Sequence, residues 1–415
     1  MDSATTNING VSEERGVNDD TRFATFIICF VSILVCGSVS TIMPAYLQNV
    51  VHDLLGKGND KYLHDKESVI NAVCLYGWMF GGILWGIICD KIGRTRSVIL
   101  STAFYGLFTV LTGLASTWFW LSACRFLSGF GIGGVLLTTN ILIAEIWPEK
   151  KRAIALGVLS ISFAIGIFST GLIQFVFPAW RQAFWIGIIP LVLAFILIWS
   201  KSESLQWIES RKLRNANKKE DAPVALPVKE LLAGSVVFGT MLIGMWAIFS
   251  WFPTWMQGLP GNRISKTGLG MMLFGIGGLS GGVISGWVVN VLGLRKTMMM
   301  CFMTCFIFAF VLFKLNVSFN TMIYPEIATL AIFFGISQGA LSLYIPQLFT
   351  TGVRALATGI CFNVGRLFTA TVVFFVGALV NFFGGYGNSI FAFSFVFLIG
   401  LITTFFSKDN STKHL

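Results

Sequence analysis

Residues 86–96 read GIICDKIGRTR and residues 286–296 read GWVVNVLGLRK, so one short pattern occurs twice at an offset of 200 residues. Each copy ends an apolar segment with Gly, followed by Asp or Asn, a second Gly and basic residues. An apolar helix that reverses within a few residues needs Gly in the turn, and basic residues collect at cytoplasmic helix ends. A repeat half a chain apart predicts two related halves.

The composition is that of a polytopic membrane protein. Hydrophobic residues make up 55% of the chain and charged residues 12%, whereas a soluble domain carries about 25% charged residues. Apolar runs of helix length recur along nearly the whole chain, which predicts an all-α membrane protein with twelve transmembrane helices. The expected spans are approximately 23–46, 67–89, 97–115, 118–145, 153–177, 182–200, 231–256, 267–289, 297–314, 322–345, 355–380 and 389–407.

One long, basic connection divides these spans six and six. We therefore expect an N-terminal tail at 1–22, a six-helix bundle at 23–200, a cytoplasmic linker at 201–230, a second six-helix bundle at 231–407 and a C-terminal tail at 408–415. The first residues are polar and mixed in charge, which argues against a cleavable signal peptide before the first span.

The net charge of +10 does not indicate a nucleic-acid partner. Most Lys and Arg fall in connections on one side of the expected spans, which is the positive-inside asymmetry and places both termini in the cytoplasm. The first outer loop, roughly 47–66, is short and favours a bacterial inner membrane. We expect a multi-pass monomer in the lipid bilayer, with no cofactor.

A second repeated pair supports the duplication. Residues 145–153 read EIWPEKKRA and residues 347–355 read QLFTTGVRA, at an offset of 202. The first pair, at 86–96 and 286–296, resembles the loop signature G-x-x-x-D-[RK]-x-G-R-[RK] of the major facilitator superfamily and its degenerate copy in the second half. The resemblance covers residues 22–407 and implies two six-helix bundles related by a pseudo-twofold axis.

Three further strings narrow the resemblance. WRQAFWIGIIP at 180–190 and SESLQWI at 202–208 are similar to strings of the sugar-porter and aromatic-acid:proton symporter branches. The second string has lost both prolines of those branches, to Ser202 and Leu205. NVGR at 363–366 is similar to the N-x-G-R string of organic-acid relatives.

The resemblance implies a secondary active transporter that works by alternating access around a midplane site. The leading hypothesis is transport of a small organic anion, a carboxylate, with proton symport as the default coupling and uniport or exchange left open. A neutral sugar or polyol porter and a transporter-like ligand sensor remain alternatives. We find no metal-ligand cluster, nucleotide-binding loop or nucleophile triad in the sequence, so an enzyme and an ATP-driven pump are not expected.

Two basic residues lie deep in expected spans, where a charge is costly and marks a functional candidate. Arg125 begins a string that resembles the R-x-x-x-G-x-G-x-G signature of the fourth helix, whose arginine serves coupling or substrate binding in relatives; packing against carbonyls is the structural alternative. Arg366 follows Arg354 by twelve residues, about 18 Å at helical rise. That depth is near the midplane, and a guanidinium there suits a carboxylate.

Other polar and aromatic side chains are candidates for the same site, although packing is their ordinary role. They are Asn140, Gln174, Trp246, Trp251, Gln338, Tyr344 and Asn363. The first expected span has no carboxylate, which departs from aromatic-acid symporters, and His64 is expected in the outer loop. Glu326 is the candidate proton site, with a solvated acid at a helix start as its alternative.

Charged residues at the cytoplasmic helix ends resemble the inner-gate network of the superfamily. The expected network comprises Asp90, Arg94, Arg96, Glu145, Arg152 and Glu203 in the first half, and Asn290, Arg295 and Arg354 in the second. Such pairs would hold the outward-open state and break when the cytoplasmic side opens. Asp90→Asn is therefore expected to shift the protein toward the inward-open state.

Overall fold

The computed structural model describes most of the chain. The described residues are 19–56, 60–199, 203–204, 207–208, 227–261, 264–349 and 354–407. Most of the expected N-terminal tail, most of the linker and the C-terminal tail from residue 408 lie outside them. All regular structure in the described ranges is helical.

Every expected span corresponds to one helix or to a broken pair of helices. The first half contains α1 (Asp19–Leu55), α2 (Asp60–Ile92), α3 (Arg94–Gly113), α4 (Trp118–Ile146), α5 (Glu149–Val176), and a sixth span broken into α6 (Trp180–Ala183), η1 (Phe184–Gly187) and α7 (Ile188–Ile198). The second half contains α9 (Val228–Gln257), α10 (Ile264–Leu292), α11 (Leu294–Phe310) with η2 (Val311–Leu315), α12 (Ile323–Gln347), α13 (Arg354–Ala378), α14 (Val380–Phe383), α15 (Tyr386–Ser394) and α16 (Val396–Phe406).

Eleven helices in the described residues are long and apolar enough to cross a membrane, and α3 is the remaining helix of the twelve. It is less apolar because it carries buried hydroxyl groups toward its neighbours. Ser97, Ser101 and Thr109 each donate to the backbone carbonyl four residues earlier. An internal hydrogen bond lets a hydroxyl enter an apolar bundle at little cost.

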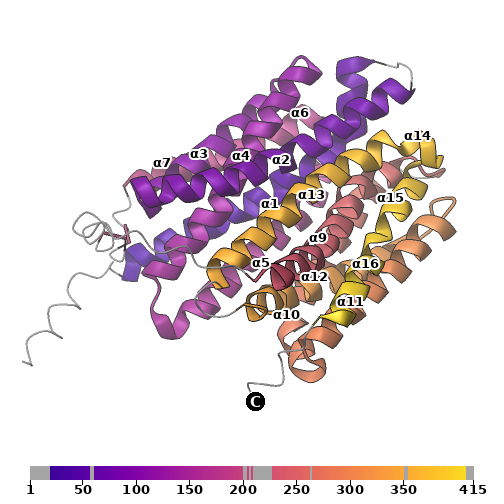
Figure 1. Ribbon diagram of the computed structural model, residues 1–415. Helices are drawn as coiled ribbons and strands as arrows, with labels where there is room; N and C mark the ends of the chain where they lie inside the picture. The colour runs from indigo at the N-terminus through magenta and orange to yellow at the C-terminus, as the bar shows by residue number, and fades with distance from the viewer. Residues whose placement is uncertain are drawn as a thin grey trace, which may run out of the picture.

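The helices form two bundles side by side. In Figure 1, α1–α7 occupy one side in indigo to pink and α9–α16 the other in red to yellow. Across the boundary α2 packs along α13, and α5 packs along α10. The all-α, two-bundle fold expected from the sequence is confirmed.

The duplication repeats in the packing of the helices. A Cβ on Gly81 of α2 would overlap the carbonyl oxygen of Phe130 in α4, and a Cβ on Gly281 of α10 would overlap that of Ile332 in α12. These contacts are related by 200 and 202 residues, the same two offsets as the repeated motifs. Small residues permit such close backbone approach between membrane helices.

The repeated turns are equally alike. Gly93 has a φ of +110° and Gly293 a φ of +80°, a region that L side chains rarely adopt. The helix that follows each Gly starts in the same way, because Ser97 donates to the Gly93 carbonyl and Thr297 to that of Gly293. We call the end of the bundle that holds these two turns the linker face, since α7 also ends there and α9 begins there. The other end is the opposite face.

Candidate functional site

A cavity of about 780 Å³ lies between the two halves. Its walls come from α2 and α5 of the first half and from α9, α10, α12 and α13 of the second. Its size matches the pockets that hold small-molecule ligands.

The repeat explains why the cavity lies mainly against the second half. Leu75 and Trp78 of α2 correspond, at the 200-residue offset, to Gly275 and Gly278 of α10, and all four line the cavity. At these positions the first half has large side chains and the second half has glycines, of which Gly278 leaves open space and Gly275 lets Phe168 of α5 approach closely. Sequence inspection did not select Trp78, although the offset from the glycines of α10 would have identified it.

Arg366 of α13 is the only charged residue among the described residues that line the cavity. It forms no ion pair or hydrogen bond with any described residue. Its guanidinium reaches the first half, since a Cβ built on Gly82 of α2 would lie 3.9 Å from Nη1 of Arg366. A guanidinium in an apolar cavity can bind an anionic group of a ligand by two parallel hydrogen bonds.

Aromatic rings close the cavity on the side of the opposite face. The rings of Trp78 and Trp246 meet edge to face across the two halves, with centroids 5.5 Å apart. Phe163 of α5 adds a third ring, 5.9 Å from Trp78. Gln338 of α12 also lines the cavity, and its Nε2 lies 3.7 Å from the sulfur of Met245.

Beyond these rings, hydrogen bonds join the two halves. Asn71 Nδ2 donates to the Ser250 carbonyl at 3.0 Å, and Gln257 Nε2 donates to the Ala45 carbonyl at 2.9 Å. Both bonds lie in the parts of α1, α2 and α9 nearest the opposite face. In the described residues, the hydrogen bonds between the halves all lie on that side of the cavity, so the structure is closed at the opposite face.

Arg125 lies elsewhere. It is fully buried within the first half, where Nη1 donates to the Val39 carbonyl of α1 at 3.1 Å and the guanidinium lies 6.0 Å from the ring of Phe184. It does not line the cavity. Its contacts are those of a residue that packs α4 against α1.

Of the other candidates, Trp246 and Gln338 line the cavity and the rest do not. Gln174 donates to the Ala45 carbonyl, and Trp251 donates to the Val373 carbonyl. Asn140 and Asn363 each donate to a carbonyl one turn back in their own helices, and Tyr344 bonds Ser407 near the linker face.

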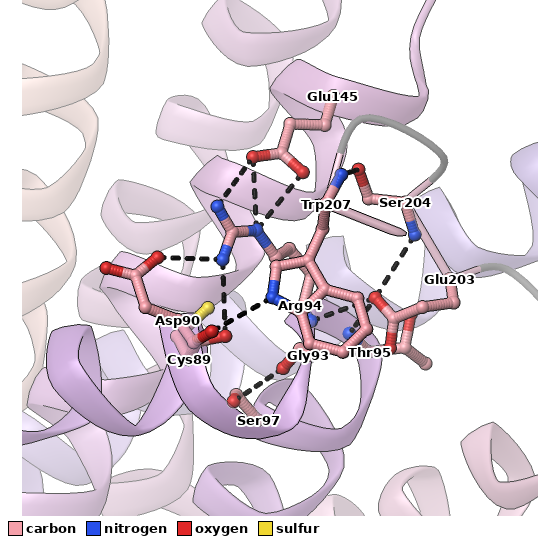
Figure 2. A network of polar contacts seen from close by, with 10 residues as sticks. All are labelled: Cys89, Asp90, Gly93, Arg94, Thr95, Ser97, Glu145, Glu203, Ser204 and Trp207. Carbon is pink, nitrogen blue, oxygen red and sulfur yellow. Dashed lines mark hydrogen bonds and ion pairs between the residues drawn. The ribbon is translucent and has the colours of Figure 1, made fainter. Parts of the chain in front are cut away.

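Four charged residues of the expected gate do meet at the linker face, as Figure 2 shows. Arg94 Nη1 lies 2.8 Å from Asp90 of α2, and Arg94 Nη2 lies 3.1 Å from Glu145 of α4. Glu203, which follows α7, accepts hydrogen bonds from the backbone N–H groups of Arg94 and Thr95. A carboxylate at the start of α3 satisfies free N–H groups and interacts favourably with the helix dipole.

This network belongs to one half of the molecule. Trp207 Nε1 reinforces it by donating to the Asp90 carbonyl, and every described partner comes from the first half or from the segment that follows α7 (Figure 2). The network is intact while the opposite face is closed. In the described residues Asp90 forms its ion pair with Arg94 of the first half, so the expected effect of Asp90→Asn on the conformational balance stays a prediction.

The remaining gate candidates do not join this network. Arg96 and Asn290 are exposed, and neither Arg96 nor Arg152 forms an ion pair within the described ranges. Arg295 instead donates to the Phe405 carbonyl of α16 and lies 5.6 Å from the Phe405 ring. The side chain of Arg354 lies outside the described residues.

Near the opposite face, the structure places Glu326 as expected at a helix start, whereas His64 lies in a helix and not in a loop. Glu326 lies in the first turn of α12 and accepts a hydrogen bond from Asn316 Nδ2 at 2.7 Å. The expectation that His64 lies in a loop is wrong, because α2 begins at Asp60 and contains both His64 and Glu67. Only 6% of Glu67 is exposed.

A sequence model of the Major Facilitator Superfamily matches residues 25–367. The chain belongs to this superfamily. It is a multi-pass membrane protein of a transporter family and not an enzyme, as the sequence motifs predicted. Its ligand is accordingly a small molecule.

Its relatives include several transporters of organic acids. It is 25% identical to the cis,cis-muconate transport protein of Acinetobacter baylyi, over 93% of this chain and 94% of that protein. It is 29% identical to the sialic acid transporter NanX of Escherichia coli, over 81% and 83%. It is 24% identical to the benzoate transport protein of Acinetobacter baylyi, over 82% and 81%.

Solved structures of the superfamily share the fold. The inward open conformation of the xylose transporter XylE from E. coli matches with a TM-score of 0.78 at 15% identity, over 94% of this chain and 98% of that one. A bacterial homologue of the human lysosomal transporter Spinster, inward-facing and unoccupied, matches with a TM-score of 0.72 at 14% identity, over 94% and 97%.

Proposed function

We propose that this protein transports a small organic carboxylate across the bacterial inner membrane by alternating access, with proton symport as the coupling. Both termini lie in the cytoplasm in this proposal, so the linker face is the cytoplasmic one. The protein acts as a monomer, and nucleic acid is not a partner.

The observation that carries the proposal is the guanidinium of Arg366 in the cavity between the halves. No described carboxylate neutralises it, and an unpaired charge in an apolar surrounding is unfavourable. A substrate anion supplies the missing charge, while the rings of Trp78, Trp246 and Phe163 accept an apolar body.

The organic acids named for the relatives support the same substrate class. The sugar-porter alternative draws on the strings at 180–190 and 202–208, which both branches share, and on solved structures at 15% identity or less, which establish the fold and not the substrate. That alternative requires a ligand whose binding does not depend on Arg366.

The test is thermal unfolding of the purified protein with benzoate, cis,cis-muconate or D-xylose, compared between wild type and Arg366→Ala. A carboxylate at a hundred times its Kd stabilises the folded state by about 2.7 kcal/mol, and this gain is absent in Arg366→Ala. Lys296→Ala removes an exposed positive charge at the start of α11 and keeps the full response.

Two outcomes redirect the proposal. Equal stabilisation of wild type and Arg366→Ala by xylose, with none by the carboxylates, establishes the sugar porter. Carboxylate binding without uptake into sealed proteoliposomes establishes the ligand sensor.

A further inference from the structure

Three polar side chains from the two halves meet at the opposite face, away from the cavity. His64 and Glu67 lie one turn apart near the start of α2, and Tyr386 is the first residue of α15. His64 Nδ1 lies 3.0 Å from Glu67 Oε2 and 2.8 Å from the Tyr386 hydroxyl, and the same hydroxyl bonds Glu67 Oε2. We call these three residues the opposite-face latch.

Glu67 is the buried member of the latch, and the partly exposed His64 and Tyr386 are held in place by their surroundings. Only 6% of Glu67 is exposed. The ring of Trp251 stacks on Tyr386 at 5.4 Å with an interplanar angle of 22°, and the His64 ring meets Tyr386 edge-on at 5.2 Å. The Trp251 indole is itself fixed by its bond to the Val373 carbonyl at 2.9 Å.

We propose that Glu67 is a proton-binding site whose occupancy sets whether the opposite face is closed. The ionised carboxylate accepts hydrogen bonds from the Tyr386 O–H and from His64 Nδ1–H, which ties α2 to α15. Hydrogen bonds to a charged acceptor are about twice as strong as neutral ones. Glu67 therefore stabilises the closed face most while it carries its charge.

Proton binding reverses this effect. A proton on Glu67 converts the acceptor-only carboxylate into a neutral carboxyl group with an O–H donor of its own. The group then faces two other donors with less acceptor capacity, and the charge-assisted bond to Tyr386 is lost. The proton enters from the opposite face and is the only species transferred. Its binding favours the state that is open on that side.

Other charged residues near Glu67 are engaged with partners of their own. Lys66 lies over the ring of Trp118 at 3.8 Å, on the side of α4. Asp53 of α1 pairs with Arg181 at 2.8 Å, and Lys314 of η2 bonds Asn388 of α15. In the described ranges, the titratable groups bonded to Glu67 are thus His64 of its own helix and Tyr386.

The inference rests on the alternating access of the proposed function but not on Arg366 or the substrate. It assigns the proton to Glu67 at the opposite face, and none of the three latch residues lines the cavity that holds Arg366. A substrate-free measurement of conformation therefore tests it separately.

The experiment measures the distance between spin labels on Leu114→Cys and Val317→Cys, one in each half at the opposite face. Both positions are exposed, whereas the eight native cysteines are buried. Without substrate, acidification increases the long-distance, open population of the wild type. If one proton binds only the open form, the ratio of open to closed rises by up to about tenfold per pH unit.

Three variants give the proposal its controls. Glu67→Gln keeps the shape but not the charge, so its population is open and independent of pH. Tyr386→Phe removes the donor on α15 and increases the open fraction at high pH. Asn71→Ala breaks a bond between the same halves, one turn further along α2 and without a titratable group; it opens the face but retains the pH response.

The outcomes separate this inference from the proposed function. A wild type whose distances ignore pH, or a Glu67→Gln variant that keeps the wild-type response, overturns the proposal. So does a His64→Gln variant that alone abolishes the response, since the imidazole would then be the proton site. Arg366→Ala keeps the response, so failure of carboxylate binding does not affect this readout.

Discussion

At the scale of single residues, Arg366 places a guanidinium in an apolar cavity without a described counter-ion. Its planar donors match a carboxylate in a bidentate pair. The proposed anionic substrate would supply the missing counter-charge. Arg125 also lies deep in an expected span, but its guanidinium donates to the Val39 carbonyl and lies near the Phe184 ring, both in its own half.

We predict that Arg366→Lys retains weak carboxylate binding. The charge remains, but one of two charge-assisted hydrogen bonds is lost, which costs about 1.5–3 kcal/mol. The dissociation constant for the carboxylate that stabilises the wild type rises by roughly 10-fold to 100-fold, measured by isothermal titration calorimetry. Wild-type affinity in the lysine variant would contradict a bidentate contact.

Glu203 caps the start of α3 at the linker face. It accepts from the backbone of Arg94 and Thr95 at the start of α3, where Gly93 offers no side-chain cap. We predict that Glu203→Ala lowers the free energy of unfolding by about 1–2 kcal/mol through loss of this cap. Thermal unfolding measures the change. Arg96→Ala, at an exposed position of the same helix, is the control and leaves the melting temperature unchanged.

At the scale of helices, glycine positions decide how closely the elements pack. Both α2–α4 and α10–α12 bring a glycine against a facing carbonyl, in Gly81 and Gly281. Because the contact repeats at the offsets of the sequence motifs, the two interfaces derive their geometry from the same few residues. Gly278 and Gly282 of α10, which line the cavity, instead leave open space where a Cβ would lie.

We predict opposite effects for two Gly→Ala changes in α10. Gly281→Ala forces a methyl group into the Ile332 carbonyl and lowers the melting temperature. Gly286→Ala meets nothing within 4 Å and raises stability, since alanine is favoured over glycine in a helix by about 1 kcal/mol. Thermal unfolding of both variants in one detergent checks this. A stabilising Gly281→Ala would contradict the close approach of α10 and α12.

At the scale of the whole molecule, the two halves meet differently on either side of the cavity. Toward the opposite face they are joined by direct hydrogen bonds, such as Tyr76 to Thr371 at 3.0 Å. At the linker face, the charged network of Arg94 ties together one half alone. Movement of the halves as bodies must therefore break the bonds at the opposite face while the network stays whole.

We predict that a cross-link between the halves at the opposite face stops transport. Tyr76→Cys with Thr371→Cys, two positions that are not buried and whose side chains meet across the halves, joined by a short bifunctional thiol reagent, holds the face closed and reduces carboxylate uptake into proteoliposomes more than tenfold. Each single variant treated with the same reagent keeps its uptake. Full uptake in the cross-linked protein would show that the opposite face does not open during transport.

Much of the architecture followed from the sequence, for a local reason. Helix-length apolar runs must satisfy their own backbone in a membrane, so the twelve helical segments and their order could be predicted. The two repeated pairs of motifs, at offsets of 200 and 202 residues, predicted the duplication. The contacts of Gly81 and Gly281 show the same two offsets. Arg366 was identifiable because a charge deep in an apolar span is rare and costly.

Local hydrophobicity and spacing are enough to predict the helices, their duplication and the depth of each charge. Which side chains share a space depends instead on how the helices pack against one another. Trp246 lines the cavity whereas Trp251, on the same helix, packs on Tyr386, because the rotation of α9 turns the two rings to different neighbours. Glu67 and Tyr386 lie 319 residues apart and meet because the halves close at the opposite face. No local pattern encodes that contact, since it depends on how two separately folded bundles come together.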